Sequence, residues 1–441
     1  MSQLHRFRSR PLVIAGACGV VVVAAAAADA ARAATVRLTS GVPAFTVVDL
    51  GAPGHSAGDL NVFQAPVIPA GRLLGVQTTL RVAAGAQVVQ GALAFDLPDG
   101  QLAVDGVSQL DPTSTGLIAG RPFTRAVVGG TGAYAGMRGE VTSTRRPDGS
   151  YDQHFTLDPA PTTGRRSLTV FSQTPGPTVL DLGATGASPG DVSIVDRGAL
   201  VDGGGARVGS VRGLQTAILT EDGQRVVLAQ VTYRLRGGDI VIGGLSGHAA
   251  DGSGNVVGVP YLRPVLGGTG AYAGATGTVT TTRGADGRYE QRFALSGISR
   301  RSTRTLHLLG ASGPSDRADV APGGVSGGDM TLFDVPVRQG RRTVGRARGV
   351  QTAIALEARA QTVSTQITYE LRGRGSLIVA GLSDYPAAGT TGTVRNRPQT
   401  RAVIGGTGEF AGAHGTVRAV RSRGGAYRLT FSLSGAPSRK R

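Results

Sequence analysis

One glycine-rich motif occurs three times in this chain at equal spacing. GGTGAYAG occupies residues 129–136 and 267–274, and GGTGEFAG occupies residues 405–412, so the motif recurs every 138 residues. Repeats of about 20–50 residues indicate solenoids or propellers, whereas an interval of 138 residues matches the length of a whole domain. The sequence therefore predicts three tandem copies of one folding unit, each long enough to bury its own core.

Within each copy the chain has the pattern of short β-strands. Apolar and β-branched residues alternate over runs such as 214–219 and 350–356, which is typical of strands. Asp148-Gly149 and Asp286-Gly287 lie between alternating runs and predict hairpins, because both turn positions favour positive φ. Seven or eight such strands in each copy, with no helix beyond a turn at the GGTG loop, predict an all-β sandwich or closed barrel. About eight strands favour a barrel with room for side chains or one small ligand.

The N-terminal segment has the pattern of an export signal. Three arginines precede an apolar run at 12–28 and a small-residue cleavage motif at 31–33. We expect export to a secreted or cell-envelope location, with a mature chain that starts near Ala34 and has no membrane span. An uncleaved membrane anchor is the alternative, and a lipoprotein attached at Cys18 is a weaker one. Three domains follow this segment, at 34–160, 165–298 and 302–436.

Composition narrows the classes of function. The formal net charge is +17, but the arginines are scattered, aromatic residues make up 5% and tryptophan is absent, so we expect no nucleic-acid partner. Cys18 is the single cysteine and the six histidines do not have metal-ligand spacing. We therefore expect no disulfide in the mature chain, no metal site and no cofactor.

The GGTG motif itself favours a structural role over phosphate binding. The Gly-Lys-Ser/Thr of a P-loop is missing, and a strand follows the motif where a dinucleotide-binding fold needs a helix. The alternative is a tight connection between strands that glycine makes possible. In that case Tyr134, Tyr272 and Phe410 of the motif are expected to close the ends of the barrels.

The wider pattern resembles the allene oxide cyclase barrel and the dirigent proteins. Three features carry the resemblance: a Gly-Asp pair at the start of a strand, a later Gly-x-Gln strand, and an apolar strand that runs into the GGTG loop. The Gly-Asp pairs are 58–59, 190–191 and 328–329, and the Gly-x-Gln triplets are 75–77, 213–215 and 349–351. The resemblance implies an eight-stranded antiparallel barrel whose lumen holds a hydrophobic small molecule. Because plant relatives form trimers, it also implies that the three barrels pack as an intramolecular pseudo-trimer.

The same resemblance implies candidate catalytic residues. Asp49, Asp181 and Asp319 each precede the aspartate of the Gly-Asp pair by ten residues, and they resemble the acid–base aspartate on the first strand of dirigent proteins. In an apolar lumen such a carboxyl would have a raised pKa and could transfer a proton near neutral pH. The alternative is a turn or capping aspartate at a strand end. Arg138 matches a dirigent arginine that pairs with the acid or the substrate, whereas copies two and three have Thr276 and His414 there.

Further positions that recur between copies are candidate ligand contacts. They are Arg125, Arg263 and Arg401, Gln77, Gln215 and Gln351, and Tyr233 with Tyr369. The arginines either reach a ligand carboxylate or extend along the barrel surface with the charge in water, and the sequence favours the surface. The glutamines either orient a ligand oxygen or bond to the neighbouring strand.

Two functions are compatible with these features. The first is binding of a hydrophobic small molecule in the barrel lumen, together with isomerisation or cyclisation of the allene oxide cyclase or dirigent type if the protein is an enzyme. The second is a non-catalytic secreted protein that uses its barrels as rigid modules for binding or envelope interaction. Triplication and the loss of the arginine from copies two and three favour the second, and the resemblance favours the first.

Overall fold

The computed structural model of the chain describes most residues between 34 and 435. The described ranges are 34–83, 85–112, 114–173, 176–221, 223–249, 251–299, 301–320, 324–357, 360–386, 390 and 392–435, without the side chain at 197. The expected signal segment at 1–33 and its Cys18 lie outside the described residues. Within the described part of the chain, no helix has the length and apolar character needed to cross a membrane.

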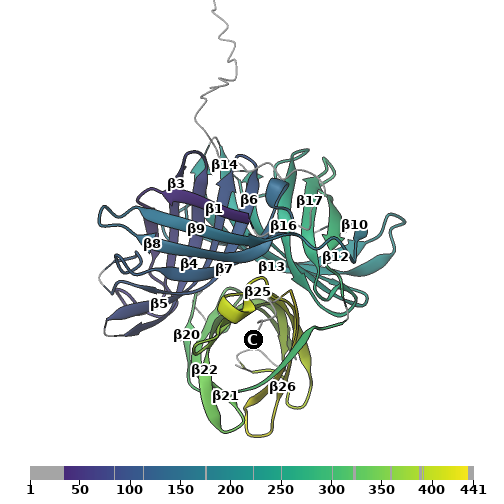
Figure 1. Cartoon of the computed structure of the whole chain (residues 1–441). Helices are drawn as coiled ribbons and strands as arrows, with labels where there is room; N and C mark the ends of the chain where they lie inside the picture. The colour runs from purple at the N-terminus through teal and green to yellow at the C-terminus, as the bar shows by residue number, and fades with distance from the viewer. Residues whose placement is uncertain are drawn as a thin grey trace, which may run out of the picture. The chain divides into compact units, whose positions relative to one another are not determined.

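The first copy folds into a closed antiparallel barrel (Figure 1). Its strands are β1 (Ala34–Ser40), β2 (Ala44–Val48), β3 (Leu60–Ile68), β4 (Arg72–Ala83), β5 (Ala86–Leu97), β6 (Gly100–Leu110), β7 (Phe123–Gly130), β8 (Arg138–Arg145) and β9 (Tyr151–Asp158). Consecutive strands from β3 to β9 pair with each other, and β9 pairs with β1. Pairing of Ser40 with Val67 joins β1 to β3 and closes the ring. The short strand β2 pairs with β3 along the same edge as β1 and continues the line of β1, so β1 and β2 together form one strand of the eight-stranded ring.

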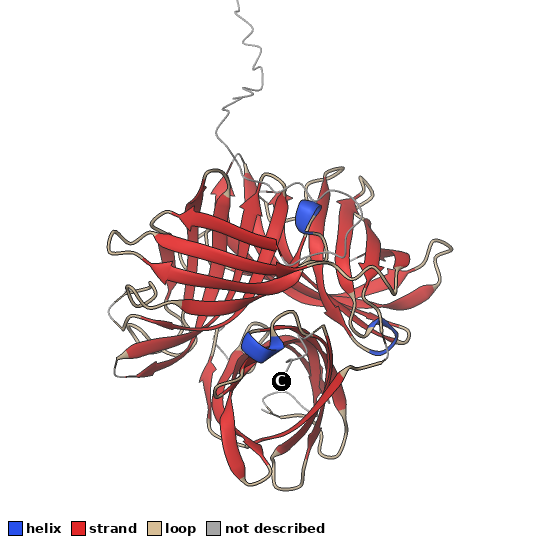
Figure 2. Ribbon diagram, in the orientation of Figure 1, coloured by secondary structure: helices blue, strands red, loops and turns tan. Residues whose placement is uncertain are grey.

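The second and third copies repeat this barrel. Barrel 2 consists of β10 (Arg166–Gln173), β11 (Thr178–Leu180), β12 (Val192–Val201), β13 (Arg207–Glu221), β14 (Gln224–Leu235), β15 (Gly238–Ala249), β16 (Pro260–Gly268), β17 (Thr276–Arg283) and β18 (Tyr289–Ser296). Barrel 3 consists of β19 (Arg304–Gly310), β20 (Ser315–Ala318), β21 (Met330–Gln339), β22 (Arg342–Glu357), β23 (Ala360–Leu371), β24 (Gly375–Tyr385), β25 (Gln399–Gly406), β26 (His414–Arg421) and β27 (Tyr427–Ser434). The predicted all-β fold of three eight-stranded antiparallel barrels is confirmed. Figure 2 shows that strands dominate the described chain, with short helical turns at the GGTG loops.

Each barrel has its own hydrophobic core inside the ring of strands. Phe95 and Phe155 meet edge to face in barrel 1, with ring centroids 4.9 Å apart. Tyr233 with Phe293 and Tyr369 with Phe431 repeat this pair in the other barrels at 5.1 Å. Valine and leucine side chains from facing strands complete these clusters. Side chains therefore fill most of each lumen.

The GGTG motif requires glycine at three positions, each for a different steric reason. In copy two, a Cβ at Gly267 would lie 2.9 Å from the Cβ of Ala402 in barrel 3, so the first glycine permits close contact between barrels. A Cβ at Gly268 would lie 2.4 Å from the carbonyl oxygen of Tyr272, inside the turn. Gly270 has a φ of +57°, in the left-handed region. The motif shapes the connection from β16 to β17 and the contact with the next barrel.

The Gly-Asp pair secures the loop that precedes β3. The Oδ1 of Asp59 accepts a hydrogen bond from the backbone N–H of Leu50 at 3.1 Å, and its Oδ2 accepts one from Ser56 at 2.6 Å. Asp191 and Asp329 accept the equivalent bonds in barrels 2 and 3. All three aspartates are buried. Their carboxylates accept hydrogen bonds from the loop backbone, so the motif has a structural role.

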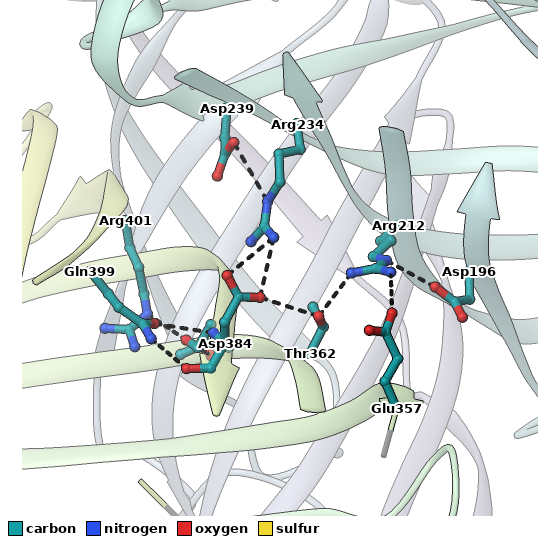
Figure 3. A network of polar contacts seen from close by, with 11 residues as sticks. Asp196, Arg212, Arg234, Asp239, Glu357, Thr362, Asp384, Gln399 and Arg401 are labelled. Atoms are coloured by element: carbon teal, nitrogen blue, oxygen red, sulfur yellow. Dashed lines mark hydrogen bonds and ion pairs between the residues drawn. The ribbon is translucent and has the colours of Figure 1, made fainter. Parts of the chain in front are cut away.

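The barrels, which all lie within one compact unit, contact each other through the outer faces of their central strands. An apolar cluster joins all three barrels: Ala103, Ala126, Val128, Val241, Leu266, Ile378, Ala380, Ala402 and Ile404. Between barrels 2 and 3, the Nη1 of Arg234 lies 3.2 Å from a carboxylate oxygen of Asp384, and Arg212 donates to Thr362 at 2.8 Å (Figure 3). Residues 150 positions apart in the chain are thereby joined.

Barrels 1 and 3 meet at a buried carboxyl group. Asp105 on β6 accepts hydrogen bonds from the Nε2 of Gln90 at 2.8 Å and from the Nε2 of Gln366, which belongs to barrel 3. Thr368 of barrel 3 donates in turn to the Oε1 of Gln90 at 3.0 Å. Burial raises the pKa of Asp105 from 3.8 to about 7, although both amide donors act in the opposite direction.

Candidate functional site

The three predicted acid–base aspartates lie outside the barrel lumens. Asp49, Asp181 and Asp319 are exposed and follow the ends of β2, β11 and β20. Asp49 accepts a hydrogen bond from the backbone of Gly54 at 3.0 Å, and Asp181 accepts one from Gly186 at 2.9 Å. The expectation of an apolar lumen position is therefore corrected, since the side chains stand at solvent-exposed turns. This placement matches the alternative of a turn aspartate.

Arg138 lies between the barrels, where it binds main-chain carbonyl groups. Its Nη1 donates to the carbonyl oxygen of Val128 at 2.8 Å and to that of Ile404, and its Nη2 donates to Leu266 at 2.6 Å. Val128, Leu266 and Ile404 are the residues that precede the GGTG motif in the three copies. The expected pairing of Arg138 with an acid or a substrate is not what the structure shows, since this guanidinium joins three barrels.

The neighbours of Arg138 explain why copies two and three carry other residues at its position. One guanidinium occupies the place where three equivalent carbonyl groups converge, and it is 3% exposed. Thr276 bonds instead to Ser296 of its own barrel, and His414 is buried. Burial, followed by the charge of Arg138, lowers the pKa of His414 to about 4. A second arginine would add an uncompensated charge to the same buried space.

The recurring arginines before the GGTG loops point into the lumens. Arg125, Arg263 and Arg401 are 3–4% exposed and alternate with the outward-facing residues of β7, β16 and β25. Arg125 donates through Nε to the Oγ of Ser108, and Arg401 donates likewise to Ser383, each at 2.7 Å. The favoured surface position was wrong. A strand buried on both faces gives no sequence signal for which face is the lumen.

The recurring glutamines and tyrosines are also buried inside the barrels. Gln77, Gln215 and Gln351 are at most 9% exposed, and the Oε1 of Gln77 has no partner within the protein. Tyr233 and Tyr369 belong to the aromatic pairs of the cores. Burial is the main reason why the pKa of Tyr369 rises to about 12. These residues therefore hold the lumen in shape, and those of barrel 2 also border a cavity.

That cavity brings three of the predicted ligand contacts together. It lies in the lumen of barrel 2, has a volume of about 60 Å³ and is bordered by Gln215, Tyr233 and Arg263. The rest of its wall consists of valines, Pro177, Gly254 and further polar side chains. The polar ones are Ser172, His248, Asn255, Thr281, Tyr289 and Gln291. The volume is well below the roughly 300–1,000 Å³ of ordinary ligand pockets, so the enclosed part of any ligand is small.

Unpaired polar atoms gather at this cavity. The Nε and Nη1 of Arg263, the Nε2 of His248 and the Nδ2 of Asn255 are buried without a hydrogen-bond partner in the protein. The Nη2 of Arg263 donates to Thr281 at 2.9 Å. In barrels 1 and 3 a serine accepts from the Nε of the equivalent arginine, whereas Ser246 of barrel 2 has no partner. Barrel 2 thus keeps donor groups free that the other barrels satisfy.

The cavity has a positive charge in its wall and no negative charge among its described residues. Burial lowers the pKa of Arg263, and burial together with the neighbouring arginines lowers the pKa of His248 to about 4. His248 is therefore neutral near pH 7. The described residues of the wall include no carboxylate, and Arg225 nearby already pairs with Asp191. Among the described residues no group of three or more potential metal ligands occurs. The site is suited to hold an acceptor group, above all an anion.

Sequence reasoning missed His248 and Asn255 as members of this site. The spacing of His248 fits neither a metal site nor a nucleophile motif, so the sequence gives it no role. Its strand position is occupied by Leu110 in barrel 1 and by Tyr385 in barrel 3, as the pairing with Gln87, Arg225 and Gln361 shows. Comparison between copies selects residues that recur, so a residue unique to one copy is overlooked. The sequence signal that could have identified His248 was the change from leucine and tyrosine in the other copies to histidine in copy two.

Comparison with known proteins gives only structural likenesses. No family model matches the chain, and no curated protein matches it. A solved structure described as pyocyanin demethylase is 23% identical, with a TM-score of 0.24, and the match covers 28% of this chain and all of that one. A heme-binding cyclase of neoabyssomicin biosynthesis is 20% identical and a Diels–Alderase from Streptomyces koyangensis is 19% identical, both with a TM-score of 0.23. Each of these matches covers 28% of this chain, a share equal to about one barrel, and 63% of the other protein.

Proposed function

We propose that this chain is a small-molecule-binding protein whose binding chamber is the cavity in the lumen of barrel 2. Arg263 carries the proposal. Its guanidinium is buried beside the cavity, two of its nitrogen atoms have no partner in the protein, and the described wall offers no carboxylate. A buried cation without a counter-ion favours an anionic ligand, because the ligand restores the missing charge-assisted hydrogen bonds.

The wall of the chamber also limits the body of the ligand. Val195, Val211, Val231 and Pro177 supply apolar surface next to the guanidinium. A volume of about 60 Å³ corresponds to a handful of water-sized groups, at about 10–15 Å³ each. We therefore propose a ligand with a carboxylate or similar head on a slim apolar body. This proposal adds a charged end to the hydrophobic ligand that the sequence predicts.

Binding without turnover is the form that the chamber supports best. Proton transfer near neutral pH requires a group with a pKa close to 7, whereas His248 has a pKa of about 4 and no carboxylate borders the described cavity. Isomerisation or cyclisation remains the catalytic form of the proposal. In that form Arg263 would stabilise negative charge that develops on an oxygen of the substrate.

Loss of the Arg263 guanidinium should weaken binding of a carboxylate. In Arg263→Met the chamber keeps its apolar wall but loses its cation, so hexanoate should bind about 30-fold more weakly than to the unchanged chain. Calorimetric titration of the whole chain with hexanoate measures this, with 1-hexanol as the neutral probe. Native mass spectrometry of the purified chain can identify a ligand that remains bound.

Arg401→Met is the matched control, because it removes the equivalent cation from barrel 3, where Ser383 already accepts from it. Hexanoate affinity should hardly change in this variant, although both variants lose one positive charge. Equal affinities of the unchanged chain and Arg263→Met for hexanoate would refute the chamber. Unfolding curves of both variants show whether barrel 2 is intact.

We also propose that the protein acts in a secreted form or at the cell envelope, and that its barrels form an intramolecular pseudo-trimer. The pattern of residues 1–33 supports export. Contacts of the first motif glycines support the trimer, because Gly129 lies against barrel 2, Gly267 against barrel 3 and Gly405 against barrel 1. N-terminal sequencing of protein recovered outside the cytoplasm should begin near Ala34. A start at Met1 would contradict cleavage.

A further inference from the structure

A second cavity lies between the barrels, outside all three lumens. Its volume is about 120 Å³, and strands of every barrel contribute to its wall. The wall repeats with the copies: Val76, Leu214 and Val350 occupy one equivalent position, and Thr78, Thr216 and Thr352 occupy the next one along the same face. A single barrel cannot form this cavity, because each barrel supplies only one part of its wall.

The wall of this central cavity is uncharged and mostly apolar. No described residue that lines it carries a charge. The amide of Gln90 bonds to Asp105 and Thr368, and the amide nitrogens of Gln230 and Gln366 donate to Ser364 and Asp105. These hydrogen bonds occupy the amide groups of the wall that would otherwise bind water most strongly. Leucines, valines and Met330 make up most of the wall, and apolar cavity surface, in a well-studied case of about 150 Å³, accepts apolar molecules.

The loops that follow β2, β11 and β20 border the central cavity. Leu50, Leu182 and Val320 line it from these loops and are the equivalent residues of the three copies. The glycine at the end of each loop also packs against the short strand of another barrel, so that these contacts run from barrel to barrel around the cavity. A Cβ at Gly58 would lie 2.4 Å from Ala318, one at Gly190 would lie 2.4 Å from Val48, and one at Gly328 would lie 2.2 Å from Leu180.

Each of these three loop residues follows an exposed aspartate. These aspartates are Asp49, Asp181 and Asp319, the predicted acid–base residues that lie outside the lumens. The loop segments 49–58, 181–190 and 319–328 contain no arginine or lysine, in a chain with a formal net charge of +17. Each loop therefore places an exposed carboxylate next in sequence to a residue of the apolar wall, while the nearby Arg225 and Arg317 pair with the buried Asp191 and with Asp329. Such an arrangement favours a cationic group next to an apolar one.

We propose that the central cavity binds the aliphatic chain of a cationic amphiphile, such as an alkylammonium compound, with its head beside the three aspartates. Burial of the chain against Leu214, Val350 and their equivalents supplies the affinity, at a free energy proportional to the apolar area removed from water. The aspartates supply the preference for a positive head. This site is independent of Arg263 and of the chamber in barrel 2, so each proposal can fail without the other.

Competition between two amphiphiles of equal chain length tests the proposal. Calorimetric titration of the whole chain below the micelle concentration should show octylammonium binding at least 10-fold more tightly than octanoate. The net positive charge of the chain would by itself favour octanoate, so the opposite order points to the local aspartates. The triple variant Asp49→Asn, Asp181→Asn and Asp319→Asn keeps the acceptor oxygens of the turns and should reduce the preference below 3-fold.

Filling the cavity should strongly weaken binding of octylammonium. Leu214→Phe and Val76→Phe each place a larger ring in the cavity from a partly exposed position, and each should weaken binding more than 10-fold. Val82→Phe, at an exposed site on the same strand as Val76, is the matched control and should leave affinity unchanged. Arg263→Met should also leave octylammonium affinity unchanged. Octanoate binding as tightly as octylammonium, or binding of octylammonium that survives both filling variants, would overturn the proposal.

Discussion

Arg138→Met should lower the free energy of unfolding of the chain by about 3 kcal/mol. The methionine has a similar length but cannot donate, so the carbonyl groups of Val128, Leu266 and Ile404 lose the guanidinium that joins them. Each buried carbonyl group left unpaired costs about 1–3 kcal/mol. Relief from burying a cation, whose pKa burial lowers to about 9, offsets part of this loss. The unpaired carbonyl groups outweigh that gain because three of them share one donor group.

Denaturant unfolding of the full chain measures the effect. Arg146→Met is the control, because Arg146 pairs with Asp152 at an exposed position, where solvent screens the ion pair and we expect almost no change in stability. Since Arg138 joins the three barrels, the variant should also separate one unfolding transition into several. A variant as stable as the unchanged chain, with a single transition, would show that the apolar contacts between barrels suffice.

Raising the pH from 5 to 8 should destabilise the unchanged chain relative to Asp105→Asn by about 3 kcal/mol. The pKa of Asp105 is raised by burial to about 7 in the folded chain, from an ordinary 3.8. Between these two values the folded chain holds a proton that the unfolded chain has released. The stability that Asp105 contributes is therefore complete below about pH 4 and is lost as the pH rises through 7, at about 1.4 kcal/mol for each pH unit.

The difference between the two pH profiles isolates Asp105 from other groups. The pKa values of His248 and His414 are lowered to about 4, and their contributions are lost as the pH falls below the ordinary histidine value of about 6.5. They act in the same way in both proteins and cancel. Asp152→Asn, at an exposed site, should follow the unchanged chain across the whole range. Parallel profiles of the unchanged chain and Asp105→Asn would show that the carboxyl group is not protonated in the folded state.

Local patterns explain why the fold could be predicted so completely. Asp-Gly turns, alternation with a period of two, and the glycines of GGTG depend on neighbours within a few residues, and they specify strands and connections one hairpin at a time. The structure adds the short strands β2, β11 and β20, which continue β1, β10 and β19 along the same edge of the neighbouring strand. The buried Asp59 shows that the Gly-Asp pair, too, serves the local loop.

The candidate site was only partly predictable for a reason of geometry. A strand in a single barrel has one face in the core and one in water, but β7, β16 and β25 have a lumen on one face and another barrel on the other. Their alternation is lost, so the sequence placed Arg263 on the surface although it lies in a lumen. Asp49 was expected in a lumen because of the resemblance, and its exposure became clear only with the strand ends in place.

Sequence alone determined the number of copies and most strands of each copy, because these depend on turn chemistry and alternation between near neighbours. Strand count and the family resemblance then favoured a closed barrel over a sandwich. Tertiary structure decided everything that depends on contacts between copies. The carbonyl groups bound by Arg138 belong to residues up to 266 positions away, and the central cavity has a wall from all three barrels. No local pattern records such contacts, since identical motifs can face a lumen, a neighbouring barrel or water.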